Sequence, residues 1–165
     1  MDDLRRTDLA FKLLDNVQNL IKFADTKTVV LLVISGVTTT FVMTNFNDLF
    51  GLCVISKIVL VLFILSFLIF IWYSIKTISP QSDKHTTDSA KKLIYYGHIA
   101  KMEVSDFIDK YSNISDKEFL DDILYQVYEN SKIASNKFNY YKTSLIAIGF
   151  QIYFFFFILT LKFIV

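Results

Sequence analysis

The sequence predicts an all-α membrane protein with about three transmembrane helices, a cytoplasmic amphipathic helix and a cytoplasmic helical hairpin. Hydrophobic residues make up 53% of the 165 residues, and the mean hydropathy is +0.44. These residues gather in three long uncharged stretches, and the charged residues lie between them. Since a run of about 18 or more uncharged apolar residues is long enough to cross a bilayer, each stretch predicts one transmembrane helix.

Residues 1–27 are predicted to form the amphipathic helix that precedes the first crossing. Their apolar residues recur at the spacing of one helix face, and polar residues such as Lys12, Asp15 and Asn19 occupy the other face. No turn signal separates this helix from the crossing that follows. The apolar positions are Ala10, Leu13, Leu14, Val17, Leu20, Ile21 and Ala24.

Residues 28–76 are predicted to hold two transmembrane helices joined by a linker at 44–51. The first, at 28–46, is about 19 residues or roughly 28 Å of helix, which just spans a bilayer core of about 30 Å. The second, at 58–75, is uncharged and rich in Ile, Leu, Val and Phe. The first crossing also carries hydroxyls that either mediate helix contacts or line a water-filled pore. They belong to Ser35, Thr38, Thr39 and Thr40.

Residues 77–142 are predicted to form the helical hairpin, and residues 143–165 the third transmembrane helix. Pro80 lies in a helix-breaking segment, after which apolar spacing predicts a helix from Thr87 or Asp88 to Tyr111. Ser115 and Glu118 have the spacing of a capping box, which predicts the start of the second helix. No stop signal precedes the uncharged stretch 143–161, so this helix is expected to continue into the membrane.

Lysine and arginine are distributed unequally between the segments that flank the crossings. Five lie before Thr28 and nine lie within residues 77–142, whereas only Lys57 and Lys162 flank the crossings on the other side. The positive-inside rule therefore predicts a cytoplasmic amino terminus and a cytoplasmic hairpin.

The composition does not favour an enzyme, a metal protein or a nucleic-acid-binding protein. The net charge is +1, the chain has one cysteine, and neither histidine has a metal-ligand partner at i+4. The four glycines are too dispersed to form a phosphate-binding loop. We therefore expect no catalytic residue, no metal and no cofactor.

Several polar residues are candidates for binding a ligand, each with a structural alternative. Asp25 and Lys27 lie where the first helix enters the bilayer. A structural ion pair or a helix cap also explains Asp25, and an interface anchor also explains Lys27. A second group mixes cations with aromatic rings, as in sites that stack a base and hold a phosphate, although a solvated helix face has the same composition. Its members are Lys91, Lys92, Tyr95, Tyr96, His98 and Lys101.

The layout resembles the transmembrane effectors of bacterial Pycsar antiphage systems. Asp25-Thr26-Lys27 matches their Asp-x-Lys element at the first crossing, and the segment 131–141, which contains Lys137, is similar to their lysine-bearing helix before the last crossing. The resemblance implies that a cognate cyclase makes a cyclic pyrimidine mononucleotide, cUMP or cCMP, as the activating ligand. Asn19, Asp25, Lys27 and Lys137, together with the cation-and-aromatic group above, are then the expected ligand-binding residues.

The resemblance further implies a multi-pass protein of the bacterial inner membrane that disrupts this membrane and causes abortive infection. Because three crossings enclose little space, we expect a homo-oligomer in the lipid bilayer. Three alternatives remain open from the sequence: an effector gated by a cyclic oligonucleotide, a membrane scaffold or anchor without a ligand, and a phage-type pore former without a trigger.

Overall fold

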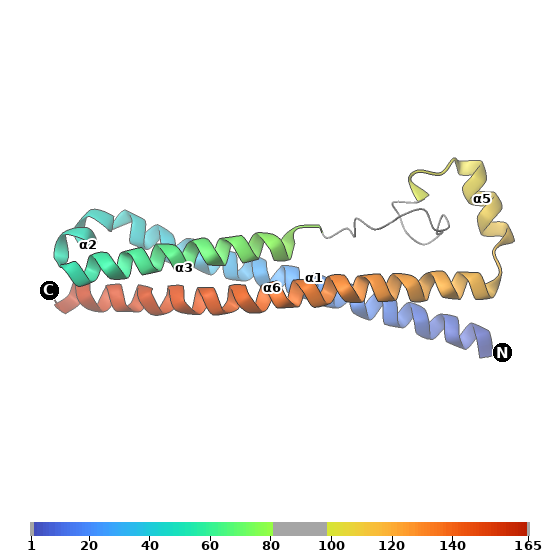
Figure 1. Cartoon of the computed structure of the whole chain (residues 1–165), viewed down its shortest axis with the longest axis horizontal. Coiled ribbons are helices and arrows are strands. Elements are labelled where there is room, and N and C mark those ends of the chain that lie inside the picture. Colours follow the sequence, from blue (N-terminus) through green and yellow to red (C-terminus); the bar gives the residue numbers. More distant parts are fainter. Residues whose placement is uncertain (1, 81–98, 165) are drawn as a thin grey trace. The chain divides into compact units, whose positions relative to one another are not determined.

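The structure, a computed structural model, describes residues 2–80 and 99–164, and these residues form helices without strands (Figure 1). Three helices are long and apolar enough to cross a membrane, which confirms the predicted all-α membrane protein. The helices are α1 (Asp2–Thr44), α2 (Phe46–Leu52), α3 (Val54–Ile78), α5 (Val104–Asn113) and α6 (Asp116–Ile164).

The chain divides into two compact units. Unit 1 comprises Met1–Ile21 and Pro80–Ser135, and unit 2 comprises Lys22–Ser79 and Asn136–Val165. The helices α1 and α6 are each unbroken and contribute to both units. The expected continuation of the polar helices into the first and third crossings is therefore confirmed.

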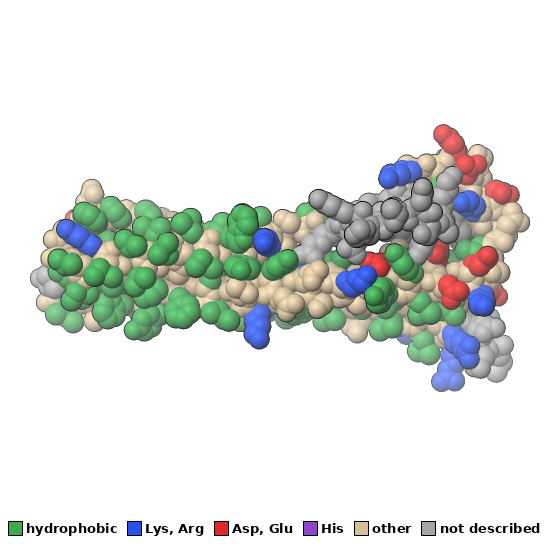
Figure 2. Space-filling model, viewed as in Figure 1, with side chains coloured by type: hydrophobic (Ala, Val, Ile, Leu, Met, Phe, Trp, Pro, Cys, Tyr) green, Lys and Arg blue, Asp and Glu red, His purple; other side chains and the backbone are tan. Residues whose placement is uncertain are grey.

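Unit 2 contains the apolar parts of α1, α3 and α6. Buried positions recur every three or four residues in α3 and at intervals of up to seven residues in α1 and α6, which is the spacing of helices packed side by side along a narrow seam. Figure 2 shows many hydrophobic side chains on the visible surface of the helices of this unit. Val33, Trp72 and Phe156 are each about 60% exposed or more, as expected for side chains that contact lipid. The buried seam includes Thr28, Ser35, Val42, Phe63, Phe70, Ser74, Ile148, Gln151 and Ile158.

Unit 1 contains a small hydrophobic core between the first turns of α1 and the first half of α6. Ala10, Leu14 and Val17 are buried, and they belong to one cluster with Ile123, Val127 and Ala134. The capping box at the start of α6 is confirmed. The backbone N–H of Ser115 donates to the Glu118 carboxylate at 3.1 Å, and the backbone N–H of Glu118 donates to the Ser115 hydroxyl at 3.3 Å.

The predicted linker at 44–51 is wrong in part, because most of it forms the short helix α2. Leu49 is fully buried in a cluster with Val42 and Phe63. The Ser56 hydroxyl donates to the Leu49 carbonyl and so joins α2 to the start of α3. Burial of one apolar face stabilises a helix of about two turns, which intrinsic helix propensity alone would not stabilise.

The predicted helix ending at Tyr111 is interrupted before Val104, and its first part lies outside the described residues. Met102 donates to the Ile99 carbonyl in a turn, and Glu103 is extended, with φ −68° and ψ 148°. None of the α5 residues is buried. Apolar spacing continues across the interruption without glycine or proline, so periodicity did not reveal it.

Candidate functional site

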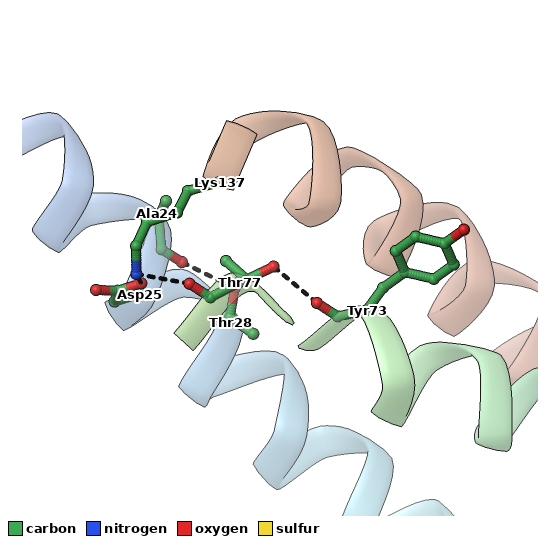
Figure 3. A network of polar contacts seen from close by, with 6 residues as sticks. All are labelled: Ala24, Asp25, Thr28, Tyr73, Thr77 and Lys137. Carbon is green, nitrogen blue, oxygen red and sulfur yellow. Dashed lines mark hydrogen bonds and ion pairs between the residues drawn. The ribbon is translucent and has the colours of Figure 1, made fainter. Parts of the chain in front are cut away.

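Three helices of unit 2 meet at one buried cation, Lys137. Its Nζ donates to Asp25 Oδ1 of α1 at 2.6 Å and to the backbone carbonyl of Thr77 in α3 at 2.6 Å (Figure 3). The Lys137 side chain is only 5% exposed, and that of Asp25 is 34% exposed. We call Asp25, Thr77 and Lys137 the junction.

Local sequence places each partner of the junction. Asp25 follows the fully buried Ala24, whose carbonyl accepts the Thr28 hydroxyl at 2.8 Å. Thr77 lies in the last turn of α3, where backbone carbonyls have no partner within the helix. A cation is favoured at this negative end of the helix dipole. Lys137 therefore caps α3 while it pairs with α1.

The electrostatics of the junction depend on both of its acceptors. A buried ammonium without a carboxylate partner is costly, so removing Asp25 leaves Lys137 with one neutral acceptor. One turn earlier in α3, the Ser74 hydroxyl is buried and has no hydrogen-bond partner within the described residues. The arrangement suits a mechanical tie between helices, since Lys137 already uses two of its three donors.

Exposed lysines and aromatic rings surround the same end of the crossings. Lys76 Nζ lies 5.1 Å from the ring centroid of Trp72 and 5.5 Å from that of Tyr140. Lys27 Nζ lies 5.4 Å from the Phe23 ring centroid. Such aromatic and cationic side chains are typical of the membrane–water interface.

The predicted ligand-binding residues are found in both units or outside the described residues. Asp25 and Lys137 contact each other, whereas Lys27 is exposed on unit 2. In unit 1, Asn19 is exposed and donates to Asp15 at 3.1 Å, and Lys101 is also exposed. The predicted residues Lys91, Lys92, Tyr95, Tyr96 and His98 lie outside the described residues.

A second polar cluster lies within the crossings and contains a residue that the sequence analysis missed. Gln151 of α6 is fully buried, and its Oε1 accepts the Ser35 hydroxyl at 2.8 Å. Its Nε2 lies 3.1 Å from the hydroxyls of both Thr38 and Thr39 and 3.3 Å from the Ser35 carbonyl. Three of the four predicted pore-lining residues are thus brought together by one amide.

The fourth predicted pore-lining residue, Thr40, does not join this cluster. It is exposed, and its hydroxyl donates to the Gly36 carbonyl of its own helix at 2.9 Å. A signal for Gln151 was present in the sequence, because it is the only amide side chain in the uncharged stretch 143–161. Polar side chains are costly in hydrocarbon, so an isolated amide there indicates a specific partner.

Comparison with known families finds one that accounts for nearly the whole chain. Residues 9–164 match a family described as Pycsar effector protein domain. Comparisons with curated proteins and with solved structures find no significant match.

Proposed function

The chain belongs to the family of Pycsar effectors of antiphage defence, and from this premise we propose that it senses a cyclic pyrimidine mononucleotide and then disrupts the bacterial inner membrane. The ligand, cUMP or cCMP, comes from a cognate cyclase and acts as a trigger without being transformed. Loss of the membrane barrier causes abortive infection. The amino terminus and the residues between the second and third crossings face the cytoplasm, where the nucleotide is made.

The observation that supports this proposal is the continuity of α1 and α6. Each helix carries polar residues of unit 1 and apolar residues of unit 2 without interruption. A ligand shifts a conformational equilibrium only if it binds one arrangement more tightly than the other. A ligand that favours one packing of the polar segments therefore changes the same helices that cross the membrane.

We assign the junction to transmission of the signal rather than to contact with the ligand. Lys137 already has a carboxylate and a carbonyl as partners and is almost fully buried. In this proposal the lysines of the cation-and-aromatic group, Lys91, Lys92 and Lys101, bind the phosphate of the nucleotide. A tyrosine of the same group stacks on the base. Loss of the junction uncouples α3 from α1 and α6, so that the signal no longer reaches all three crossings.

Several copies of the chain are required to form a path through the membrane. The three crossing helices of one chain pack on each other along their buried seam, and so few helices leave no room for a channel between them. We propose that a homo-oligomer in the bilayer brings the hydroxyls of Ser35, Thr38, Thr39 and Thr40 to the path.

The test is leakage from liposomes that contain the purified protein and a fluorescent dye. Nucleotide is supplied on both faces, so that the result does not depend on orientation. Wild type is expected to release dye with cUMP or cCMP. Asp25→Ala is expected to insert normally and to release none, because the junction is lost. Asp8→Ala, which removes an exposed carboxylate from the same helix, is the matched control and is expected to respond like wild type.

Each alternative gives a different result in this assay. Dye release that only a cyclic oligonucleotide triggers identifies an effector gated by a cyclic oligonucleotide. Release from wild type without any nucleotide identifies a pore former without a trigger. If no nucleotide triggers dye release, the proposal is contradicted, and the membrane scaffold or anchor without a ligand is the remaining alternative.

A further inference from the structure

The polar cluster of Ser35, Thr38, Thr39 and Gln151 lies near the middle of the membrane-spanning parts of α1 and α6. Residues 35–39 are central in the uncharged stretch 28–46, and Gln151 is central in the stretch 143–161. All four residues belong to unit 2. While α1 and α6 are packed together, neither water nor lipid headgroups reach this depth to replace a lost hydrogen-bond partner.

The amide of Gln151 is fully satisfied, and all of its partners belong to α1. Its oxygen accepts from Ser35, and its nitrogen faces two threonine hydroxyls and one backbone carbonyl. Separation of α1 from α6 would leave a buried primary amide without partners. In dry hydrocarbon this is strongly unfavourable, whereas water that enters the gap supplies both donors and acceptors.

The hydroxyls of α1 and the amide of Gln151 differ in whether they can find a hydrogen-bond partner within their own helix. A hydroxyl in a membrane helix can donate to a carbonyl of its own helix, and the Thr38 hydroxyl already donates to the Ser35 carbonyl at 3.0 Å. No hydrogen bond joins the Gln151 amide to α6 itself among the described contacts. The amide is therefore the group that requires either α1 or water.

We infer that Gln151 couples separation of α1 and α6 to the entry of water, so that in the oligomer the opened faces of α1 and α6 line a hydrated path for water and small ions. This inference deepens the proposed function and depends on it for the trigger. Each chain contributes one amide and three hydroxyls to the path and no charge, so the path selects only weakly between cations and anions. When α1 and α6 are together, the same groups satisfy each other and the path is closed.

Substitutions on the two sides of the cluster should have opposite effects. Gln151→Leu removes the need for water, so the helices can part with lipid between them and a hydrophobic constriction stays dry. Nucleotide-triggered ion leakage should then fall about three- to tenfold, the scale of one interhelical hydrogen bond in a membrane. The variant Ser35→Ala/Thr38→Val/Thr39→Val leaves the amide short of partners in the closed state, so leakage without nucleotide should rise by a similar factor.

Gln151→Glu gives a readout that a purely structural role would not produce. The substitution preserves size, and in a hydrated path the carboxyl ionises and attracts cations. The triggered current across a planar bilayer should therefore become cation-selective, with a reversal potential that moves toward that of K⁺ in a KCl gradient. Phe150→Leu, at an exposed neighbouring position, is the matched control and should keep the weak selectivity of wild type.

The experiment compares these five proteins in the same bilayers, with cUMP and cCMP as the added nucleotides and correct insertion checked by helical circular dichroism. The inference is overturned if the hydroxyl-free variant, Ser35→Ala/Thr38→Val/Thr39→Val, leaks no more ions than wild type without nucleotide. It is also overturned if Gln151→Glu conducts with unchanged ion selectivity. Failure of wild type to respond to either nucleotide contradicts the proposed trigger instead. The nucleotide-free leakage of the hydroxyl-free variant still decides the role of Gln151 in that case.

Discussion

The Lys137 side chain links all three crossing helices of unit 2. It pairs with Asp25 of α1 and caps the last turn of α3 through the Thr77 carbonyl. Because the Lys137 ammonium is nearly fully buried, the free-energy cost of burying its charge is offset only while both acceptors are present. A conservative change at either end of the ion pair therefore tests whether the junction stabilises the fold.

Asp25→Asn should lower the free energy of unfolding by about 3 kcal/mol, the low end for breaking a buried ion pair, because Asp25 is 34% exposed. The double variant Asp25→Asn/Lys137→Met should be less destabilised than the single variant, since no buried charge remains. Denaturant titration of the detergent-solubilised protein measures both. The swap Asp25→Lys/Lys137→Asp should not restore stability, because a carboxylate would then face the Thr77 carbonyl. A double variant that is more destabilised than Asp25→Asn would contradict this coupling between the two side chains.

Glu118 gives the start of α6 a pH dependence. Its pKa is lowered from the ordinary value by the hydrogen bond from the Ser115 hydroxyl and then by that from the Ser115 backbone N–H. A lowered pKa in the folded state means that the stabilisation is present above the unfolded pKa and is lost as pH falls through the folded pKa. Amide exchange at residues 116–119 should therefore accelerate below about pH 4.5, relative to the rest of α6. In Glu118→Gln this difference should disappear, and an unchanged pH profile in that variant would contradict the capping role.

The long helices were the most predictable elements of the chain. Uncharged length alone located the three crossings, and the Ser115–Glu118 spacing located the start of α6. These signals are local, so a single sequence contains them in full. The same holds for the continuity of α1 and α6, because no glycine or proline lies where the polar part of each helix meets its crossing.

Features that depend on contacts between distant residues were not predictable. Lys137 and Asp25 are 112 positions apart, and the sequence suggested each as a ligand contact without showing that they pair. Gln151 was missed because its partners are on another helix. The short helix α2 also depends on such contacts, since Leu49 is buried against residues from elsewhere in the chain. Pairing and burial are decided by the fold rather than by local spacing.

Interruption of α6 tests whether its continuity matters for function. Ser135 is exposed, and a proline there removes one backbone hydrogen bond and clashes with the preceding turn, at a local cost of about 3 kcal/mol. Ser135→Pro should retain nucleotide binding, measured by calorimetry, but lose nucleotide-triggered leakage. Ser135→Ala, which preserves the helix, is the control. Normal leakage from the proline variant would show that the signal does not pass along α6.

Unit 2 has the dimensions and chemistry of a membrane-spanning body. Its helix α3 has 25 residues, or about 37 Å of helix, which exceeds a bilayer core of about 30 Å by roughly the depth of the interfaces. Cations mark both ends of the crossings. Lys76 lies over Trp72 at one end, and at the other Lys162 donates to Asn45 at 2.7 Å and Lys57 lies 4.7 Å from the Phe50 ring centroid.

The single cysteine allows the orientation of the whole molecule to be measured without engineering. Cys53 lies between α2 and α3 and is partly exposed, and the proposed topology places it outside the cytoplasm. A membrane-impermeant maleimide should therefore modify Cys53 in spheroplasts. In Cys53→Ser/Ser112→Cys, the thiol lies on an exposed position of α5 and should react only after lysis. The reverse pattern would put α5 outside the cell, away from a cytoplasmic nucleotide, and the proposed sensing mechanism could not operate.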